Sequence, residues 1–235
     1  MTNLSTEQAA SPTPAQLLGR DESALVDADG HLLHTAIVDD WLAMRAAAAT
    51  AGFDLAIASS YRSFARQLTI WNDKATGHRP LYDGEGELIE VAALDDRSLI
   101  KAILRWSAIP GASRHHWGTD LDIYDRSAVE VGYQLQLSPE EVGEGGVFYP
   151  LHAWLDEYLS DDQAAFYRPY RGQGGIAAER WHLSHRRTSH SFAQLMTPSL
   201  LRMTLASVEP EQLALQAALL THMNSLYPAY VAPYL

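Results

Sequence analysis

The segment from residue 113 to residue 125, SRHHWGTDLDIYD, contains two adjacent histidines and three aspartates. Imidazole nitrogens and carboxylate oxygens bind zinc in proteins that offer no thiolate ligand. The chain has no cysteine, so a metal here must be held by His, Asp or Glu side chains. The segment is therefore either part of a metal site or a solvated acidic loop with unrelated histidines.

A hydrolytic zinc site needs three protein ligands, an open position for water and a carboxylate that takes the proton of that water. His115, Asp122 and His182 supply such a ligand set, and Glu179 supplies the carboxylate. The odd spacing of His115 and Asp122 prevents them from sharing a face of one continuous strand, but Gly118 allows a turn between them. Glu179 and His182 share a face only if Glu179 lies on the turn before a strand or on a helical turn.

Three segments, in a fixed order, are similar to the signatures of one peptidase family. SRHHWGTDLD resembles the S-x-H-x-x-G-x-x-x-D signature of VanY-type zinc D-alanyl-D-alanine carboxypeptidases, and ERWH resembles their E-x-W-H signature. SSYRSFARQ resembles the S-x-Y-R-S-x-x-x-Q element of the same family. The resemblance spans residues 59–182 and leaves both ends of the chain unmatched.

The resemblance implies a metal centre with one Zn²⁺ per chain. Its ligands fall on His115, Asp122 and His182, and the catalytic base falls on Glu179. The family commonly has a small residue where this chain has Asp120, whose side chain on a strand would point to the same side as Asp122. Asp120 is thus either a partner of a ligand or an alternative ligand.

The resemblance also implies a substrate-binding group. The arginine and glutamine that the family uses for substrate binding and transition-state stabilisation fall on Arg62 and Gln67. A carboxypeptidase must recognise a terminal carboxylate, and the candidates for this contact are Arg62, Gln67 and Ser113. Arg180 stands where the family often has proline before the tryptophan, and we expect this change to be tolerated.

The implied function is hydrolysis of the terminal D-Ala from peptidoglycan-type peptides by a zinc-activated water, assisted by Glu179. A D-Ala-D-Ala dipeptidase or a murein endopeptidase of the same fold would use the same residues. A zinc-bearing binding module without turnover is another alternative, but it would not need Glu179. If the three matches were coincidental, the chain would be an acidic α+β domain without a metal.

Other polar and aromatic residues near these motifs have simpler interpretations. Asp125 is expected to be solvated or to support a ligand, and Trp117 and Trp181 to form walls of the site or core. We expect packing or surface positions for four further histidines: His116, His152, His185 and His190.

The elements that position these residues follow from hydrophobic periodicity. Helices are predicted over residues 36–52 and 64–77, within 96–113, where Pro110 and Gly111 end the helix, within 147–162 from Leu151 onward, and over most of the chain beyond 185. Strands are predicted in 53–63, 121–125 and 131–137, and at the end of 168–185, where the strand carries Trp181 and His182. A surface loop is predicted over 78–96.

These elements and the resemblance predict an α+β fold, in which a small, mainly antiparallel sheet carries the zinc site and helices flank it. We divide the chain into a flexible amino-terminal arm over 1–16, a zinc peptidase domain over 17–187 and a helical extension over 188–235 that packs on the domain. The 47% of hydrophobic residues are enough for a sizeable core.

Charge narrows the range of partners. The formal net charge of -12 argues against nucleic acid and anionic membranes as partners, so the expected partner is a peptidoglycan-derived peptide. No membrane-spanning segment or signal peptide is visible, so the sequence as written predicts a cytoplasmic location, or a periplasmic one if a leader is missing or another export route is used. The sequence gives no indication of an oligomeric state.

Overall fold

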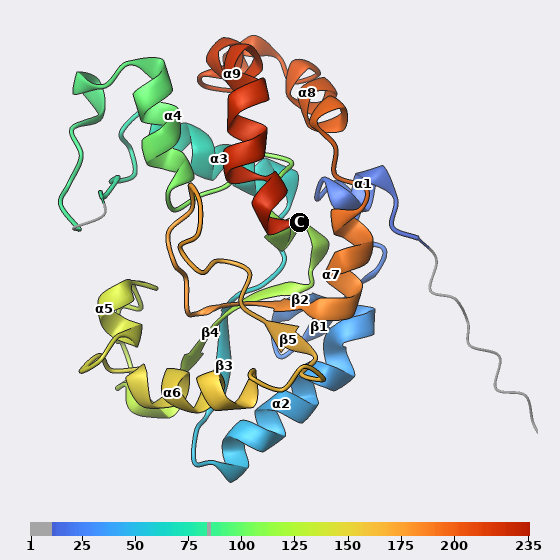
Figure 1. The fold of residues 1–235 in the computed structure, drawn as a ribbon, viewed down its shortest axis with the longest axis vertical. Coiled ribbons are helices and arrows are strands. Elements are labelled where there is room, and N and C mark those ends of the chain that lie inside the picture. Colours follow the sequence, from blue (N-terminus) through green and yellow to red (C-terminus); the bar gives the residue numbers. More distant parts are fainter. Residues whose placement is uncertain (1–10, 84–85) are drawn as a thin grey trace, which may run out of the picture.

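The computed structural model describes residues 11–83 and 86–235 and has an α+β fold. Its main sheet has four antiparallel strands in the order β3-β4-β6-β5 (Figure 1). Their bounds are Leu55–Ser59 for β3, Asp120–Asp125 for β4, Phe166–Tyr167 for β5 and His182–His185 for β6. A separate hairpin pairs β1 (Leu25–Ala28) with β2 (His31–His34).

One face of the main sheet is apolar and covered by two helices, α2 (Val38–Thr50) and α6 (Tyr149–Tyr158). Leu121 and Ile123 of β4 and Leu183 of β6 point to this face, because alternate residues of a strand share a side. In Figure 1 both helices lie below the sheet. Asp120, Asp122 and Tyr124 are therefore left for the opposite, polar face.

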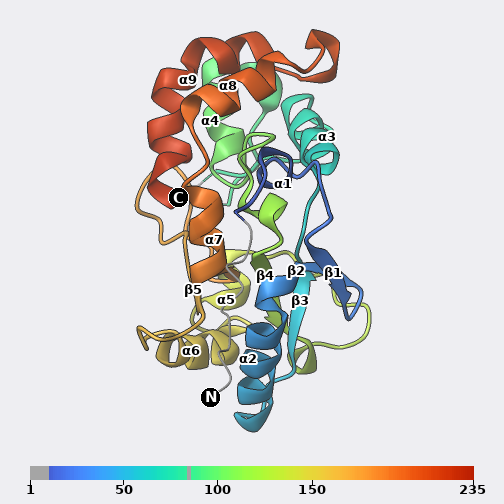
Figure 2. The same cartoon turned by 90° about the vertical axis from the view of Figure 1, so that its right-hand side faces the viewer.

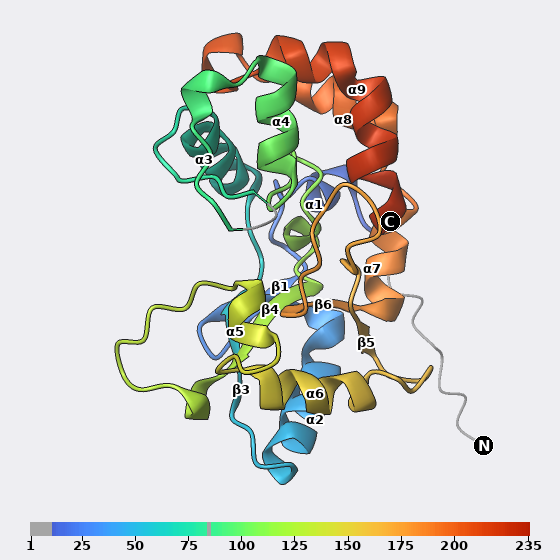
Figure 3. The same ribbon diagram turned by 60° about the vertical axis from the view of Figure 1, so that its left-hand side comes forward.

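A group of helices lies on the other side of the sheet, and most of them form the upper part of the molecule in Figures 2 and 3. Its helices are α1 (Pro14–Leu17), α3 (Phe64–Ala75), α4 (Asp96–Leu104), α7 (Arg186–Ala193), α8 (Pro198–Ala206) and α9 (Gln216–Tyr230). They share one hydrophobic core, and Trp71 of α3 donates its indole N–H to Ala214 O at 2.8 Å. The carboxy-terminal helices thus complete the core that begins with α3 and α4.

Most predicted elements are confirmed with shorter bounds. The helices predicted over 36–52, 64–77, 96–113 and 147–162 correspond to α2, α3, α4 and α6, and the carboxy-terminal part is mainly helical. The predicted loop 78–96 holds a 3-10 turn, Val91–Ala93, and the start of α4. The strand predicted to carry Trp181 begins one residue later, at His182.

The strand predicted over 131–137 is wrong: this segment has no strand and leads into a short helix, α5 (Pro139–Val142). The Glu141 carboxylate accepts the Gln136 N–H at 3.0 Å and the Tyr133 hydroxyl at 2.8 Å, which folds the segment back on itself. Leu137 adopts φ +53°, which ends the extended conformation. Leu135 and Leu137 pack against the cluster that contains Phe148 rather than in a sheet, and Val131 is exposed.

The predicted division into arm, domain and extension stays a prediction, but the end of the predicted arm, residues 1–16, overlaps a helix. Residues 1–10 of the arm lie outside the described residues, but helix α1 begins at Pro14, with Thr13 as its cap, and Leu17 is buried. Within the described part of the chain, no helix has the length and apolar character needed to cross a bilayer.

Candidate metal centre

Three potential ligands meet on the polar face of the main sheet. Asp122 of β4 lies directly opposite His182 of β6 in the ladder, so both side chains leave the same face. His115 belongs to a 3-10 turn just before β4, and Gly118 ends that turn at φ +67°, a conformation that favours glycine. One ligand atom from each of the three side chains lies within 4.8 Å of the other two. The turn that the odd spacing required is present.

The hydrogen bonds of His115 determine which ring nitrogen faces this centre. Nδ1 lies 2.8 Å from the Ser60 carbonyl oxygen, and because a carbonyl only accepts, Nδ1 carries the proton. In the neutral ring, favoured because burial lowers the pKa of His115, Nε2 holds a lone pair 3.3 Å from Asp122 Oδ2. A lone pair facing a carboxylate is repulsive, and a cation bound between the two would remove that repulsion.

His182 presents its other nitrogen to the same point. Nε2 donates to Asp120 Oδ1 at 2.9 Å, while Nδ1 lies 3.1 Å from Asp122 Oδ1 and 3.6 Å from Glu179 Oε2. Burial lowers the pKa of His182, but the neighbouring carboxylates of Asp120 and Asp122 outweigh this and raise the pKa to about 9. Donation of one ring N–H to a carboxylate is how proteins orient a histidine whose second nitrogen binds a metal.

Asp122 gives the clearest indication that the ligand group fits a cation. Its Oδ1 is buried and makes no hydrogen bond of acceptable geometry, although it lies 3.1 Å from His182 Nδ1. Buried carboxylate oxygens are rarely left without a partner. Two imidazole nitrogens and one carboxylate oxygen also form a donor set that suits a hydrolytic zinc ion. The residues present therefore fit the metal.

Asp120 is a partner of a ligand and does not belong to the ligand group. It is fully buried and accepts hydrogen bonds from Arg114 Nε at 2.8 Å, from the Thr119 hydroxyl at 2.7 Å and from the Ser184 hydroxyl at 3.1 Å. Burial raises the pKa of Asp120, but Arg114 and His182 outweigh it and hold the pKa well below its usual range. Asp120 is therefore an anion that fixes the orientation of His182.

Glu179 reaches the ligand group from the turn that precedes β6. Its carbonyl accepts the His182 N–H at 3.2 Å, so the first of the two geometries expected from the spacing is the one adopted. The carboxylate is 13% exposed and lies 3.6 Å from His182 Nδ1. Burial raises its pKa to about 7, against the lowering effect of His182. A carboxyl group with such a pKa can both accept and return a proton near neutral pH.

Arg62 and Gln67 have different positions relative to the site. Arg62 lines the cavity in front of the ligands, and its backbone N–H donates to His115 O at 3.0 Å. Gln67 is fully buried behind it: its Oε1 accepts from Arg62 Nη1 at 2.9 Å, and its Nε2 donates to Ala108 O at 2.7 Å. Gln67 thus holds the guanidinium group in place and does not face the cavity. Ser113 does face it.

The ligand group opens into a cavity of about 700 Å³, a size typical of small-molecule sites. Besides Arg62, Ser113, Glu179 and the three ligands, its walls come from α3, from the following segment 79–83, from 106–108 and from 136–140. Trp181 and Tyr170 also line it.

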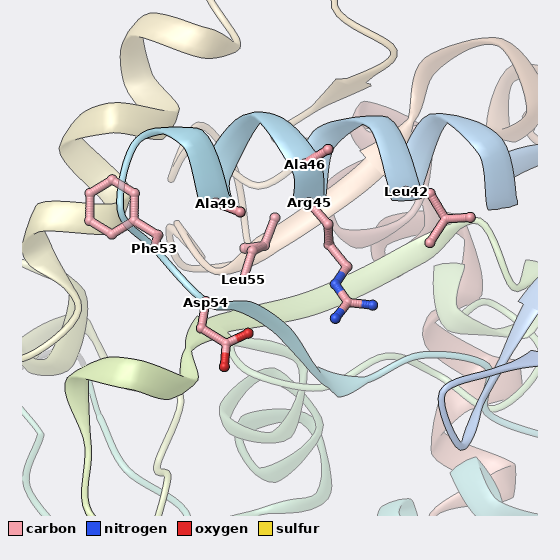
Figure 4. A pocket seen from close by; sticks show the side chains of 7 residues that line it. All are labelled: Leu42, Arg45, Ala46, Ala49, Phe53, Asp54 and Leu55. Atoms are coloured by element: carbon pink, nitrogen blue, oxygen red, sulfur yellow. The ribbon is translucent and has the colours of Figure 1, made fainter.

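A second hollow of about 300 Å³ lies on α2 and the start of β3 (Figure 4). Its two charged side chains are already paired, Asp54 with Arg126 and Arg45 with Asp29. It lies away from the ligand group, so the larger cavity is the candidate site.

The remaining histidines and Asp125 have structural positions. His116 accepts the Gly111 N–H at 3.1 Å, and His185 pairs with Asp40 at 2.9 Å. His152 is buried beside Arg168, and His190 contacts Gln194. Asp125 was expected to be solvated or to support a ligand, but it is buried and caps the backbone N–H groups of residues 54 and 127.

Three residues of this region were not found from the sequence: Arg114, Tyr170 and Lys74. Arg114 is buried and joins Asp120 to the carbonyl of Tyr234. The Tyr170 ring lies 4.7 Å from the His182 ring and 5.1 Å from the Tyr234 ring. Most of these contacts join residues that are far apart in the chain, so the sequence does not indicate them. Lys74 is the exception: it follows Gln67 by seven residues on the same face of a predicted helix, and this spacing could have identified it.

A family model and two known proteins match parts of this chain. The family model described as VanY, D-alanyl-D-alanine carboxypeptidase, matches residues 30–188. Two proteins of Haemophilus influenzae, both described as uncharacterized, are also similar to this chain. One is 40% identical over 102 residues, which cover 41% of this chain and 70% of that protein. The other is 31% identical over 124 residues, which cover 52% and 92%.

Three solved structures are also similar to this chain. A mutant of the vancomycin-resistance D,D-pentapeptidase VanY in complex with Zn(II) has a TM-score of 0.47 and 23% identity, covering 68% of this chain and 77% of that one. VanYB in complex with D-alanine-D-alanine has a TM-score of 0.48 and 20% identity, covering 79% and 89%. The LD-carboxypeptidase LdcB has a TM-score of 0.48 and 23% identity, covering 80% and 79%. Since the family model matches more than half of the chain, the protein belongs to the VanY D-alanyl-D-alanine carboxypeptidase family of metallopeptidases.

Proposed function

We propose that this protein is a zinc-dependent D-alanyl-D-alanine carboxypeptidase that removes the terminal D-Ala of a peptidoglycan-type peptide. The observation that carries the proposal is the position of Glu179, which faces the same cavity as the three ligands and has a pKa raised to about 7 by burial. A metal held for structure or for binding alone needs no such carboxylate beside it.

The ligand set would hold one zinc ion through Nε2 of His115, a carboxylate oxygen of Asp122 and Nδ1 of His182. Bound there, zinc supplies a Lewis acid that polarises a peptide carbonyl and lowers the pKa of water to about 7. The hydrogen bonds of His115 to Ser60 and of His182 to Asp120 keep both rings in the required orientation.

Glu179 and Arg62 provide the remaining steps. The Glu179 carboxylate accepts a proton from the attacking water and returns it to the amine of the leaving D-Ala. Negative charge grows on the carbonyl oxygen during attack, and the Arg62 guanidinium, held by Gln67, stabilises that charge more than it stabilises the bound substrate.

The size of the cavity bears on the length of the substrate. At about 700 Å³, it extends from the ligands along α3 and the segment 136–140. This favours a peptide longer than a dipeptide, and hence a carboxypeptidase over a D-Ala-D-Ala dipeptidase. A murein endopeptidase would also use a long cavity, and product analysis separates the two because only a carboxypeptidase releases free D-Ala.

The function is tested by metal content together with D-Ala release. We expect about one zinc per chain and chelator-sensitive release of D-Ala from a peptide ending in D-Ala-D-Ala. Glu179→Gln, which keeps the shape of the side chain, should retain zinc and lose turnover by at least about 100-fold, the low end of a general base's contribution. Release that persists in this variant, or in zinc-free protein, would contradict the proposal.

A further inference from the structure

Lys74 lies in the last turn of α3 and lines the cavity together with Arg62 and Glu179. We propose that its ammonium group binds the terminal carboxylate of the substrate. This inference rests on the proposed function and adds to it a residue that lies outside the three matched motifs.

Among the described residues, one cation in the cavity wall makes neither an ion pair nor a side-chain hydrogen bond. Three lysine and arginine side chains of the described residues line it: Arg62, Lys74 and Arg79. Arg62 is bound by Gln67 at 2.9 Å, and Arg79 pairs with Asp73 at 3.3 Å. Within residues 11–83 and 86–235, Lys74 has neither an ion pair nor a side-chain hydrogen bond. Its charge is therefore available to a ligand.

The position of Lys74 matches the chemistry of the leaving group. Lys74 and Glu179 line the same cavity, and the charge of Lys74 lowers the pKa of Glu179, so the ammonium group is within electrostatic reach of the general base. Glu179 gives a proton to the amine of the departing D-Ala, and the carboxylate of that D-Ala is only two bonds from the amine nitrogen. A cation close to Glu179 in the cavity is thus placed where this carboxylate must lie.

A lysine near the end of a helix has a simpler explanation, in which it interacts with the helix dipole. Such a lysine keeps its ammonium group in water, as expected of the exposed Lys101 near the end of α4. Lys74 instead turns into the cavity, where burial lowers its pKa to about 8. A carboxylate ligand would offset the desolvation of this cation, whereas the helix end alone does not require it to be buried.

The test uses the zinc-loaded full chain carrying Glu179→Gln, so that bound peptide is not hydrolysed. Calorimetry compares an acetylated tripeptide ending in D-Ala-D-Ala with the same peptide as its carboxy-terminal amide. The variants are Lys74→Met, which removes the charge and keeps the length, and Lys74→Arg, which keeps the charge. Lys101→Met is the matched control, because residues 74 and 101 are the only lysines in the sequence.

We expect the parent to prefer the acid over the amide. Lys74→Met should weaken binding of the acid by about 10- to 100-fold and leave binding of the amide unchanged, as expected for one charge-assisted hydrogen bond. Lys74→Arg should retain most of the preference, and Lys101→Met all of it. If Lys74→Met preserves the preference for the acid, or the parent has none, the inference is wrong, and Lys74 only adjusts the charge around Glu179.

Failure of the proposed function would look different. In that case the unsubstituted protein releases no D-Ala, yet the acid still binds more tightly than the amide and Lys74→Met removes the difference. If the parent binds neither peptide, both the inference and the proposed substrate are refuted.

Discussion

Asp120→Asn removes one negative charge beside the metal ligands while keeping the size of the side chain. In the native site, Oδ1 faces Arg114 Nε at 2.8 Å and His182 Nε2 at 2.9 Å, and Oδ2 accepts two hydroxyl groups, from Thr119 and Ser184. An asparagine can place its oxygen at the first position and donate its amide protons to the two hydroxyl oxygens. The substitution therefore isolates the charge.

Two losses follow from the removed charge. A carboxylate that supports a metal-bound histidine contributes about 10- to 100-fold to metal affinity, or about 1.4 to 2.7 kcal/mol. The Arg114 side chain is only 3% exposed and would remain buried without its counter-charge. Breaking such a pair costs about 3 to 5 kcal/mol, and because the hydrogen bonds are kept, we expect a loss of about 3 kcal/mol in the free energy of unfolding.

Competition with a chromophoric chelator measures the zinc affinity, and urea unfolding of the zinc-free protein measures the stability. Asp125→Asn is the matched control, because Asp125 is a buried aspartate of the same strand that accepts backbone N–H groups away from the ligands. It should lower the stability and leave the zinc affinity unchanged. The reasoning is refuted if Asp120→Asn binds zinc as the parent does. If Asp120→Ala abolishes binding and Asp122→Ala does not, the ligand assignment itself is wrong.

Three further predictions concern stability and the support of the site. Burial lowers the pKa of His152 to about 3. The neutral, buried ring therefore contributes its full stability above pH 6.5, and this contribution to the free energy of unfolding falls by about 1.4 kcal/mol per pH unit from there towards pH 3. His152→Leu should lose this part of the pH dependence when stability is measured by urea unfolding. Tyr234→Phe removes the acceptor of the Ile176 N–H, 3.0 Å away, next to the cavity; it should lower both stability, by about 1 kcal/mol, and kcat, whereas Tyr227→Phe should lower stability alone. At Gly118, with φ +67°, an added Cβ would lie 2.5 Å from a leucine side chain. Gly118→Ala should therefore lower the free energy of unfolding by more than the about 1 to 2 kcal/mol of backbone strain, and it should also weaken zinc binding.

The sequence was most informative where chemistry depends on residues close together in the chain. The odd spacing of His115 and Asp122 required a turn, and Gly118 provides it. The three positions between Glu179 and His182 required a turn before the strand, and the backbone hydrogen bond between them forms one. These are local constraints, so a single sequence is enough to state them.

The sequence was least informative where partners are distant. Gln67 was expected to bind substrate, but the carbonyl of Ala108 draws its side chain behind Arg62. The alternation in 131–137 indicated a strand, but the carboxylate of Glu141 captures the backbone of that segment. In each case a hydrogen bond from another part of the fold determines the conformation, and a local sequence pattern does not predict such a bond.

The different roles of the two aspartates of β4, Asp122 as a ligand and Asp120 as a partner of His182, follow from strand register. Asp122 pairs with His182 and Asp120 with Ser184, so both carboxylates lie on the His182 side of the sheet, one at each ring nitrogen. A shift of one residue would turn Leu121 towards the ligands and both aspartates towards the hydrophobic core. The register is held by Leu121 and other apolar residues packed against α2 and α6 on the far face, which touch no ligand. The apolar face thus keeps both aspartates on the side of the ligands, and the pairing of Asp122 with His182 places Asp122 at Nδ1 of that histidine and Asp120 at Nε2.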